Sequence, residues 1–301
     1  MNDHAVDPPI GAPGAPREAA PTLRLGLIGG AIGRSKSPSI HETEAAAHGI
    51  RCSYELIDLD DRHVGVESLE QLLVEVERNG FAGVNVTYPC KQAIIPLLHE
   101  LSDEARAIGA VNTVRFVSGR RVGYNTDAFG FAESIRGGLR NASLEAVTQV
   151  GAGGAGAATA YALLGLGVRR LTLVDVDDRR ADALATILKR RFPERDIAST
   201  RELARALESA DGVVNATPIG MAKHPGSAIP RDLLRASMWV ADIVYFPLET
   251  QLLRDARALG CRTLDGGGMV ISQAARAFEI FTGLTADRDR MRRHFDQIDH
   301  S

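Results

Sequence analysis

One stretch, 146–175, constrains what this chain can fold into more than any other part of the sequence. A short apolar run typical of a buried strand leads directly into the pattern G-x-G-x-x-G at 151–156. Helix-forming residues follow, and a second strand-like run, 170–174, ends at Asp175. Strand, glycine turn, helix, strand and closing acid in this order predict a Rossmann unit that binds a dinucleotide, rather than an ordinary glycine-rich turn.

Each glycine of the motif has a mechanical role in such a unit. Gly151 allows a tight turn, Gly153 lets backbone N–H groups approach a pyrophosphate, and Gly156 lets helix and strand pack closely. The phosphates would bind at the helix N-terminus, where free N–H groups and the helix dipole favour negative charge. The predicted cofactor-binding residues of this loop are Gly151, Ala152, Gly153, Gly154, Ala155 and Gly156.

Asp175 bears on which dinucleotide is bound. A carboxylate at the end of the second strand accepts hydrogen bonds from the 2′- and 3′-hydroxyls of the ribose, but it repels a 2′-phosphate. NAD is therefore the expected cofactor, in preference to NADP. Arg179 and Arg180 leave the alternative open, because they lie just past the strand and arginine binds phosphate; otherwise they belong to a solvated first helical turn.

The composition is that of a soluble globular protein, since 45% of the 301 residues are hydrophobic, 24% are charged and the formal net charge is −3. This length accommodates two domains. No basic stripe or long run of like charge points to nucleic acid or to a membrane surface. The longest uncharged run, 146–168, holds six glycines and belongs to the predicted nucleotide loop, not to a membrane span.

Cysteines and the N-terminal residues bear on cellular location. Cys52, Cys90 and Cys261 show no C-x-x-C spacing, which suits the reducing cytoplasm and argues against a structural metal. Residues 1–22 contain five prolines and few large apolar side chains, and they lack the apolar core of a signal peptide. They predict a disordered tail.

Strand-like and helix-like runs alternate along the chain, which predicts an α/β fold with mostly parallel sheets. Ligands of such sheets gather beyond the carboxyl ends of the strands. Asn85, Thr87 and Lys91 follow a strand-like run and lie at such an end. Farther along, the glycines at 266–268 predict a turn that leads into an apolar helix over 270–281.

Two serines mark the start of a predicted helix over 39–48. Ser37 before Pro38 is a favoured N-cap, which is the simpler interpretation of this serine. Ser35 and Ser37 also place two hydroxyls beside free helix N–H groups, a combination that binds a carboxylate.

Five further motifs occur in a fixed order: S-K-S-P at 35–38, N-V-T-x-P-x-K at 85–91, G-A-V-N-T at 109–113, N-T-D at 125–127 and G-M-x-x-x-Q at 268–273. With these motifs and the glycine loop, the chain from Leu23 onward resembles the shikimate dehydrogenase family, and most of all its NAD-dependent quinate/shikimate dehydrogenases. NADP-using members of that family usually carry Asn-Arg-Thr where this chain has Asp-Val-Asp at 175–177, which agrees with NAD.

The resemblance implies reversible hydride transfer between a ring carbinol of shikimate, which becomes 3-dehydroshikimate, and a nicotinamide, with quinate as a second substrate. The alcohol loses a proton as the hydride leaves, so a base must lie within hydrogen-bond reach. The resemblance assigns this role to Lys91, with Asp127 as its partner. Burial lowers the pKa of a lysine, while a carboxylate raises it and fixes the side chain. The simpler interpretation is a surface lysine and a helix-capping aspartate.

The resemblance also implies binding roles for other residues. Ser35 and Ser37 would bind the substrate carboxylate. The partners implied for the ring hydroxyls are Asn85, Thr87, Asn112, Asp127 and Gln273. Near the nicotinamide or the substrate entrance, the resemblance implies Tyr245 as a substrate contact and Thr217, Gly266 and Met269 as cofactor contacts. Plain core packing is the alternative for Tyr245 and Met269.

Together these features predict an N-terminal α/β substrate domain, 23–125 completed by 265–301, and a Rossmann NAD-binding domain, 126–264, with a cleft between them. The expected partners are small molecules, with no metal, no nucleic acid and no membrane, and the chain is expected to be a monomer or a homodimer. Three other functions stay open: a quinate-preferring dehydrogenase, an aminoshikimate dehydrogenase, and an NAD-binding sensor without catalytic activity.

Overall fold

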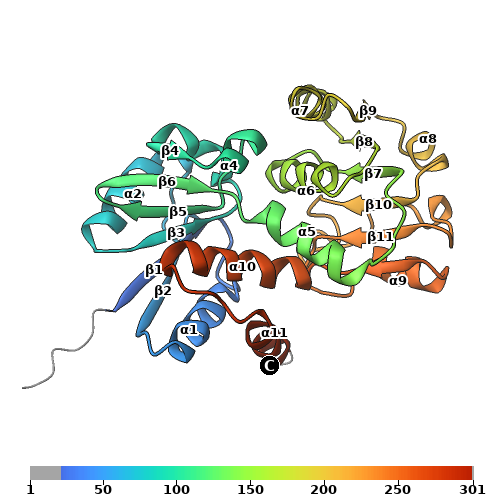
Figure 1. The fold of residues 1–301 in the computed structure, drawn as a ribbon. Helices are drawn as coiled ribbons and strands as arrows, with labels where there is room; N and C mark the ends of the chain where they lie inside the picture. Colours follow the sequence, from blue (N-terminus) through green and yellow to red (C-terminus); the bar gives the residue numbers. More distant parts are fainter. Residues whose placement is uncertain (1–21, 300–301) are drawn as a thin grey trace, which may run out of the picture.

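The computed structural model describes residues 22–299, which fold into two α/β lobes (Figure 1). Each lobe is built on one six-stranded sheet. The tail predicted over 1–22 lies outside the described residues, apart from Thr22. Within residues 22–299, no helix is both long enough and apolar enough to span a membrane. The predicted α/β fold is confirmed.

The sheet of the first lobe is mixed, with the strand order β2-β1-β3-β5-β6-β4. Strand β1 pairs in parallel with β2 and β3, whereas β5 runs antiparallel to β3 and β6. The strands are β1 (Leu23–Gly29), β2 (Cys52–Asp58), β3 (Gly83–Val86), β4 (Glu100–Leu101), β5 (Thr113–Val117) and β6 (Arg120–Tyr124). The helices are α1 (Ser37–Ala47), α2 (Leu69–Arg78), α3 (Cys90–Ala93) and α4 (Asp103–Ile108), with 3₁₀ turns at Val66–Ser68 and Ile95–Leu97. Because Ile28 pairs with Val86, the carboxyl ends of β1 and β3 lie at one edge of this sheet.

The sheet of the second lobe is parallel throughout, with the strand order β12-β11-β10-β7-β8-β9. The strands are β7 (Ala146–Val150), β8 (Arg170–Val174), β9 (Asp196–Thr200), β10 (Gly212–Asn215), β11 (Trp239–Asp242) and β12 (Arg262–Leu264). The helices are α6 (Gly154–Gly165), α7 (Asp178–Arg191), α8 (Leu203–Glu208) and α9 (Gln251–Ala258), with a 3₁₀ turn at Arg231–Leu233. The chain runs from β7 to β8 and β9 on one side and returns to β10 on the other. Strand β7 is therefore the switch point beyond whose carboxyl end such a sheet binds its ligand.

Two helices, α5 (Asp127–Gly138) and α10 (Gly267–Thr282), pack side by side between the two sheets (Figure 1). The last helix, α11 (Arg288–Asp299), packs against α1 and α10. Gly130 permits the close approach of α5 and α10, because a Cβ there would lie 2.7 Å from the carbonyl oxygen of Met269 and 2.9 Å from the backbone nitrogen of Gln273. The contact brings Gln273 to the first turns of α5.

The prediction of a turn at 266–268 is wrong for Gly267 and Gly268, which are helical. Helix α10 already begins at Gly267. A Cβ on Gly268 would lie 2.5 Å from the Ser134 hydroxyl of α5. Gly268 therefore allows α10 and α5 to approach each other, whereas the sequence pattern indicated a bend in the chain.

His41 gives the first lobe a pH-dependent stability. Its ring is 1% exposed and stacks on Tyr54 with centroids 5.0 Å apart. Burial lowers the pKa of His41 to about 4, although the charge of Glu44 opposes the shift. The unfolded chain takes up this proton near pH 6.5 and the folded chain only near pH 4, so the free energy of unfolding falls as the pH drops through that window.

We expect wild-type protein to lose about 2 kcal/mol more stability than His41→Leu between about pH 7.5 and pH 5, because the leucine variant has no proton to take up at this position. Urea unfolding of both proteins at the two pH values measures the difference. Equal losses in the two proteins would contradict a buried neutral histidine.

Candidate active site

Lys91 and Asp127 meet where the two lobes join. Lys91 lies on α3, just after β3, and Asp127 is the first residue of α5. The distance from Lys91 Nζ to Asp127 Oδ2 is 2.6 Å, and the two side chains are 16% and 3% exposed. Lys91 is therefore not a surface lysine. The helix start does not depend on Asp127 either, since Asn125 Oδ1 accepts hydrogen bonds from the backbone nitrogens of Asp127 and Ala128 at 3.0 and 3.2 Å.

Asn112 holds the Asp127 carboxylate from its other side. Its Nδ2 donates to Asp127 Oδ1 at 2.9 Å, and its own Oδ1 accepts from the backbone nitrogen of Thr126 at 2.8 Å. Both carboxylate oxygens therefore have a defined donor. An ammonium carries three donors, and within residues 22–299 Lys91 uses one of them, so two remain for a ligand.

Tyr54 connects the serine pair to this polar cluster. Its hydroxyl donates to Asn85 Oδ1 at 2.8 Å, and Asn85 Nδ2 donates to Thr113 Oγ1 at 3.0 Å. The Ser37 hydroxyl bonds the same phenol, and burial raises the pKa of Tyr54, so the phenol stays protonated. Tyr54 was not among the predicted site residues, because a tyrosine in a strand looks like any other core residue.

The serine pair differs from its prediction in one respect. Lys36, not Ser37, occupies the N-cap of α1, and Ser37 is the first residue of the helix. Ser35 Oγ accepts from the backbone nitrogen of Ser37 at 3.3 Å and lies 3.1 Å from Ser37 Oγ. The N-cap prediction for Ser37 is wrong because the helix starts one residue earlier, which leaves Pro38 within its first turn.

Thr87 and Gln273 offer polar groups without a partner. The Thr87 hydroxyl makes no hydrogen bond within the described part of the chain, although its backbone nitrogen bonds to Ile28. Gln273 Oε1 is buried and has no hydrogen-bond partner among the described residues. Buried polar atoms are normally satisfied, so an orphaned acceptor points to a ligand that donates to it.

The glycine loop is held in a fixed shape by backbone packing. Gly151 has a φ of 105°, and a Cβ there would lie 2.7 Å from the carbonyl oxygen of Ala216. A Cβ on Gly156 would collide with the carbonyl of Gly151. Gln149, on β7, donates from Nε2 to the carbonyl oxygens of Gly151 and Gly156 at 2.8 Å each. Helix α6 then begins at Gly154, with Gly153 as its N-cap.

The glycine loop lies directly beside the lysine of the first lobe. A Cβ on Gly154 would lie 3.7 Å from Lys91 Cβ and 3.9 Å from Ala110 Cβ. The apolar core is also continuous here, since Ile108 and Ala110 belong to the same cluster as the buried residues of α6. The N-terminus of α6 and the Lys91–Asp127 pair therefore belong to one site.

Asp175 follows β8 and contacts the same loop. Its Oδ2 accepts from the backbone nitrogen of Ala152 at 2.7 Å, and its Oδ1 accepts from that of Asp177 at 2.9 Å. Arg179 and Arg180 pair with Asp177 at 3.4 and 3.6 Å and remain largely exposed. A carboxylate, not a cation, therefore lies closest to the loop on this side.

The remaining predicted residues lie beyond β10, β11 and β12. Thr217 donates from its backbone nitrogen and hydroxyl to Asn215 Oδ1, at 3.1 and 2.7 Å. Tyr245 is 37% exposed. Gly266 allows the chain before α10 to pass close to β11, because a Cβ there would lie 2.6 Å from the carbonyl oxygen of Val244. Met269 is 6% exposed and packs among the buried residues of the core. This position agrees with plain core packing, the alternative interpretation of Met269.

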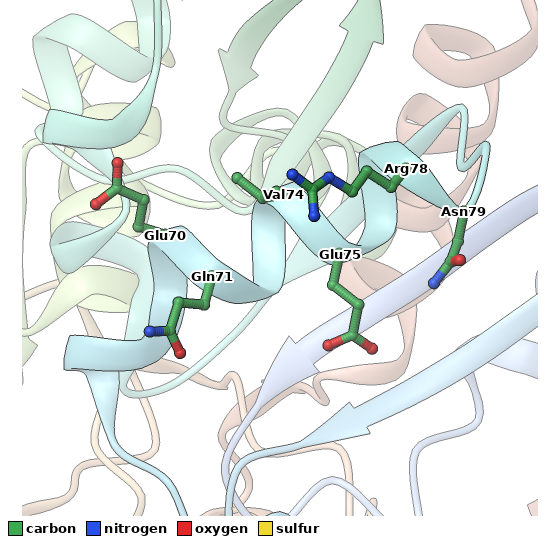
Figure 2. A pocket seen from close by; sticks show the side chains of 6 residues that line it. All are labelled: Glu70, Gln71, Val74, Glu75, Arg78 and Asn79. Carbon is green, nitrogen blue, oxygen red and sulfur yellow. The ribbon is translucent and has the colours of Figure 1, made fainter.

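Residues 22–299 contain no cluster of three or more histidine, cysteine, aspartate or glutamate side chains that could hold a metal ion. Figure 2 shows a surface hollow on the outer side of α2, and none of the predicted site residues lines it. Its lining residues are Glu70, Gln71, Val74, Glu75, Arg78 and Asn79. The candidate site is therefore defined by converging polar groups at the junction of the lobes.

The fold and the site define a pyridine-nucleotide-dependent oxidoreductase. Comparison with known proteins leads to the same class. The sequence matches the family models described as shikimate dehydrogenase substrate binding domain, over residues 27–114, and shikimate 5'-dehydrogenase C-terminal domain, over residues 266–294. The chain belongs to the shikimate dehydrogenase family.

Relatives of known name cover nearly the whole chain. It is 53% identical over 269 residues to a shikimate dehydrogenase (NADP(+)) of Streptomyces avermitilis, a match that covers 89% of this chain and 92% of the relative. It is 49% identical over 278 residues to a quinate/shikimate dehydrogenase (NAD(+)) of Corynebacterium efficiens, covering 91% and 98%. The solved structure of quinate dehydrogenase from Corynebacterium glutamicum in complex with NAD has a TM-score of 0.86 at 45% identity, covering 92% of this chain and 99% of that chain. The relatives are named for two different nucleotides, so the choice between them has to come from this chain's own residues.

Proposed function

We propose that this protein is an NAD-linked shikimate dehydrogenase that also oxidises quinate. The observation that carries the proposal is the position of the Lys91–Asp127 pair beside the glycine loop, where a Cβ added to Gly154 would lie 3.7 Å from Lys91 Cβ. The pair provides proton transfer and the loop provides a dinucleotide site. Both are needed at one point for the oxidation of an alcohol.

Lys91 acts as the acid–base group in this proposal. When bound, NAD supplies the acceptor for the hydride that leaves the ring carbon. In this direction the uncharged amine form of Lys91 takes the hydroxyl proton at Nζ and becomes an ammonium, and in reverse the ammonium returns this proton to the ketone oxygen. Asp127 orients the ammonium through their 2.6 Å contact, and Asn112 orients Asp127.

The hydrogen-bond network supports the proposed mode of substrate binding. The Ser35 and Ser37 hydroxyls, beside the free N–H groups of α1, bind the carboxylate. The ring hydroxyls bind to Asn85, Thr87, Asn112 and Gln273, and the unpartnered Gln273 Oε1 accepts from one of them. Tyr245 covers the substrate from the second lobe.

The surroundings of Asp175 support NAD over NADP. Asp175→Asn keeps an acceptor for the Ala152 nitrogen and removes the charge that repels a 2′-phosphate. We expect kcat/KM with NAD to fall about tenfold and kcat/KM with NADP to rise, because an amide is a weaker partner for the ribose hydroxyls than a carboxylate. Steady-state kinetics with both nucleotides measures the ratio, and Asp182→Asn on α7 is the matched control. An unchanged ratio in Asp175→Asn would contradict this role.

Absorbance at 340 nm, with shikimate or quinate and with NAD or NADP, tests the proposed function. We expect the highest kcat/KM with shikimate and NAD, and a lower value with quinate. A higher kcat/KM with quinate would identify a quinate-preferring enzyme. Turnover of an aminoshikimate alone would identify an aminoshikimate dehydrogenase. Binding of NADH without turnover of any of these would identify a nucleotide sensor.

A further inference from the structure

Asp242 is a buried carboxylate that the proposed chemistry does not use. It is the last residue of β11 and is 2% exposed. Its Oδ1 accepts from Asn215 Nδ2 and from the backbone nitrogen of Val244, both at 3.0 Å, and its Oδ2 accepts from Thr250 Oγ1 at 2.7 Å. Within residues 22–299 no cation pairs with it, and burial raises the pKa of Asp242 to about 6.

The three groups that donate to Asp242 belong to two separate segments of the chain, so the Asp242 side chain joins these segments. Asn215 holds the segment 216–221, because its Oδ1 accepts from the nitrogen and hydroxyl of Thr217 and its Nδ2 also donates to the carbonyl oxygen of Ile219 at 2.9 Å. Val244 and Thr250 bracket the segment that carries Tyr245. Asp242 therefore ties Thr217 and Tyr245 to the same fixed point.

The order of the strands places this point under one half of the cofactor site. Asp175, at the adenosine ribose, follows β8 on one side of β7, whereas β10 and β11 lie on the other side. A dinucleotide whose phosphates lie at the glycine loop therefore extends its nicotinamide half over the ends of β10 and β11. The segment after β10 touches the glycine loop, since a Cβ on Gly151 would lie 2.7 Å from the Ala216 carbonyl oxygen.

We propose that Asp242 is a positioning residue that fixes Thr217 and Tyr245 as one wall for the nicotinamide half of the cofactor. The inference rests on the proposed function only in that the cofactor is a dinucleotide. An ionised carboxylate accepts hydrogen bonds at both oxygens, so Asp242 satisfies all three donors at once. Removing it leaves those donors unsatisfied and releases both segments.

Two ligands separate this role from a general structural one. NADH carries the nicotinamide ring, whereas ADP-ribose keeps the adenosine, the two phosphates and the second ribose and lacks only that ring. For Asp242→Ala we expect the Kd of NADH to rise about tenfold, while the Kd of ADP-ribose stays within about twofold of wild type. Asp242→Asn is the conservative variant, since its Oδ1 still accepts from Asn215 and Val244 and the Thr250 hydroxyl can reverse its role, so both Kd values stay within about threefold.

Fluorescence titration with NADH and calorimetry with ADP-ribose measure these constants. Asp211→Ala is the control, because Asp211 lies at the amino ends of β7 and β10, where it accepts from Ser143 Oγ at 2.8 Å and from the nitrogen of Ala146 at 2.9 Å. Equal weakening of both ligands by Asp242→Ala, or no weakening of either, would overturn the proposal. If Asp242→Ala does not fold, Thr250→Val provides the test. We expect its Kd for NADH to rise about threefold and its Kd for ADP-ribose to stay unchanged. If the protein binds NADH but does not oxidise shikimate, the proposed function is overturned. The role of Asp242 is still tested in that case, because the comparison of the NADH and ADP-ribose Kd values needs no turnover.

Discussion

Replacing Lys91 by methionine is expected to lower kcat by about a hundredfold to ten-thousandfold and to change the KM for shikimate much less. Methionine keeps the length of the side chain and packs against the glycine loop, but it holds no proton. The amine would be lost from a site where Asp127 and Asn112 remain in place, so the substrate would still bind while its hydroxyl proton has no acceptor. Steady-state kinetics at 340 nm measures both constants.

Lys189→Met, on the exposed side of α7, is the matched control and should leave kcat unchanged. A kcat of Lys91→Met near that of wild type would remove Lys91 from the mechanism. A rise in KM at constant kcat would make Lys91 a binding residue and would require another base.

Gly156→Ala is expected to lower the affinity for NADH at least about a hundredfold. The added methyl group would collide with the carbonyl of Gly151, which Gln149 holds from below, so neither the loop nor the first turn of α6 can move aside without losing buried hydrogen bonds. The N–H groups that bind the pyrophosphate would then be displaced. Fluorescence titration with NADH measures the effect.

The same helix supplies the control for this experiment. Gly165, the last residue of α6, has nothing within 4 Å of an added Cβ. Gly165→Ala should bind NADH like wild type and gain up to about 1 kcal/mol of stability, because alanine loses less backbone entropy than glycine on folding. Wild-type affinity in Gly156→Ala would show that the loop does not bind the phosphates.

The part of the fold that the sequence predicted well is the part in which each segment carries its own signal. The strand, loop, helix and strand from β7 to β8 appear where the glycine pattern and the apolar runs indicated them. Strands β4 and β9 were not predicted, for two different reasons. Strand β4 has two residues, too few for any periodicity, and β9 is an edge strand with Ile197 as its one fully buried side chain. Both exist because a neighbouring strand offers hydrogen bonds, which is information from the folded state.

The site shows a similar division. Lys91 and Asp127 are 36 positions apart, and only the family resemblance joined them before the fold was seen. Asn125, which accepts from the backbone nitrogen of Asp127, entered the sequence analysis only as part of the N-T-D motif. Tyr54, which donates to Asn85, gave no signal of its own, because a tyrosine in a strand is ordinary. Their roles follow from the packing of β2, β3 and α5, which brings the polar ends of these elements together.

Transfer of deuterium from the carbinol carbon of shikimate to NAD tests the central claim most directly. Shikimate labelled at the carbon that becomes the ketone would be incubated with wild-type protein and NAD, and the reduced nucleotide would be analysed by mass spectrometry. We expect every molecule of NADH formed to carry the deuterium, and its formation to require both protein and shikimate. Unlabelled NADH, or no NADH from a protein that still binds the nucleotide, would contradict hydride transfer at this site.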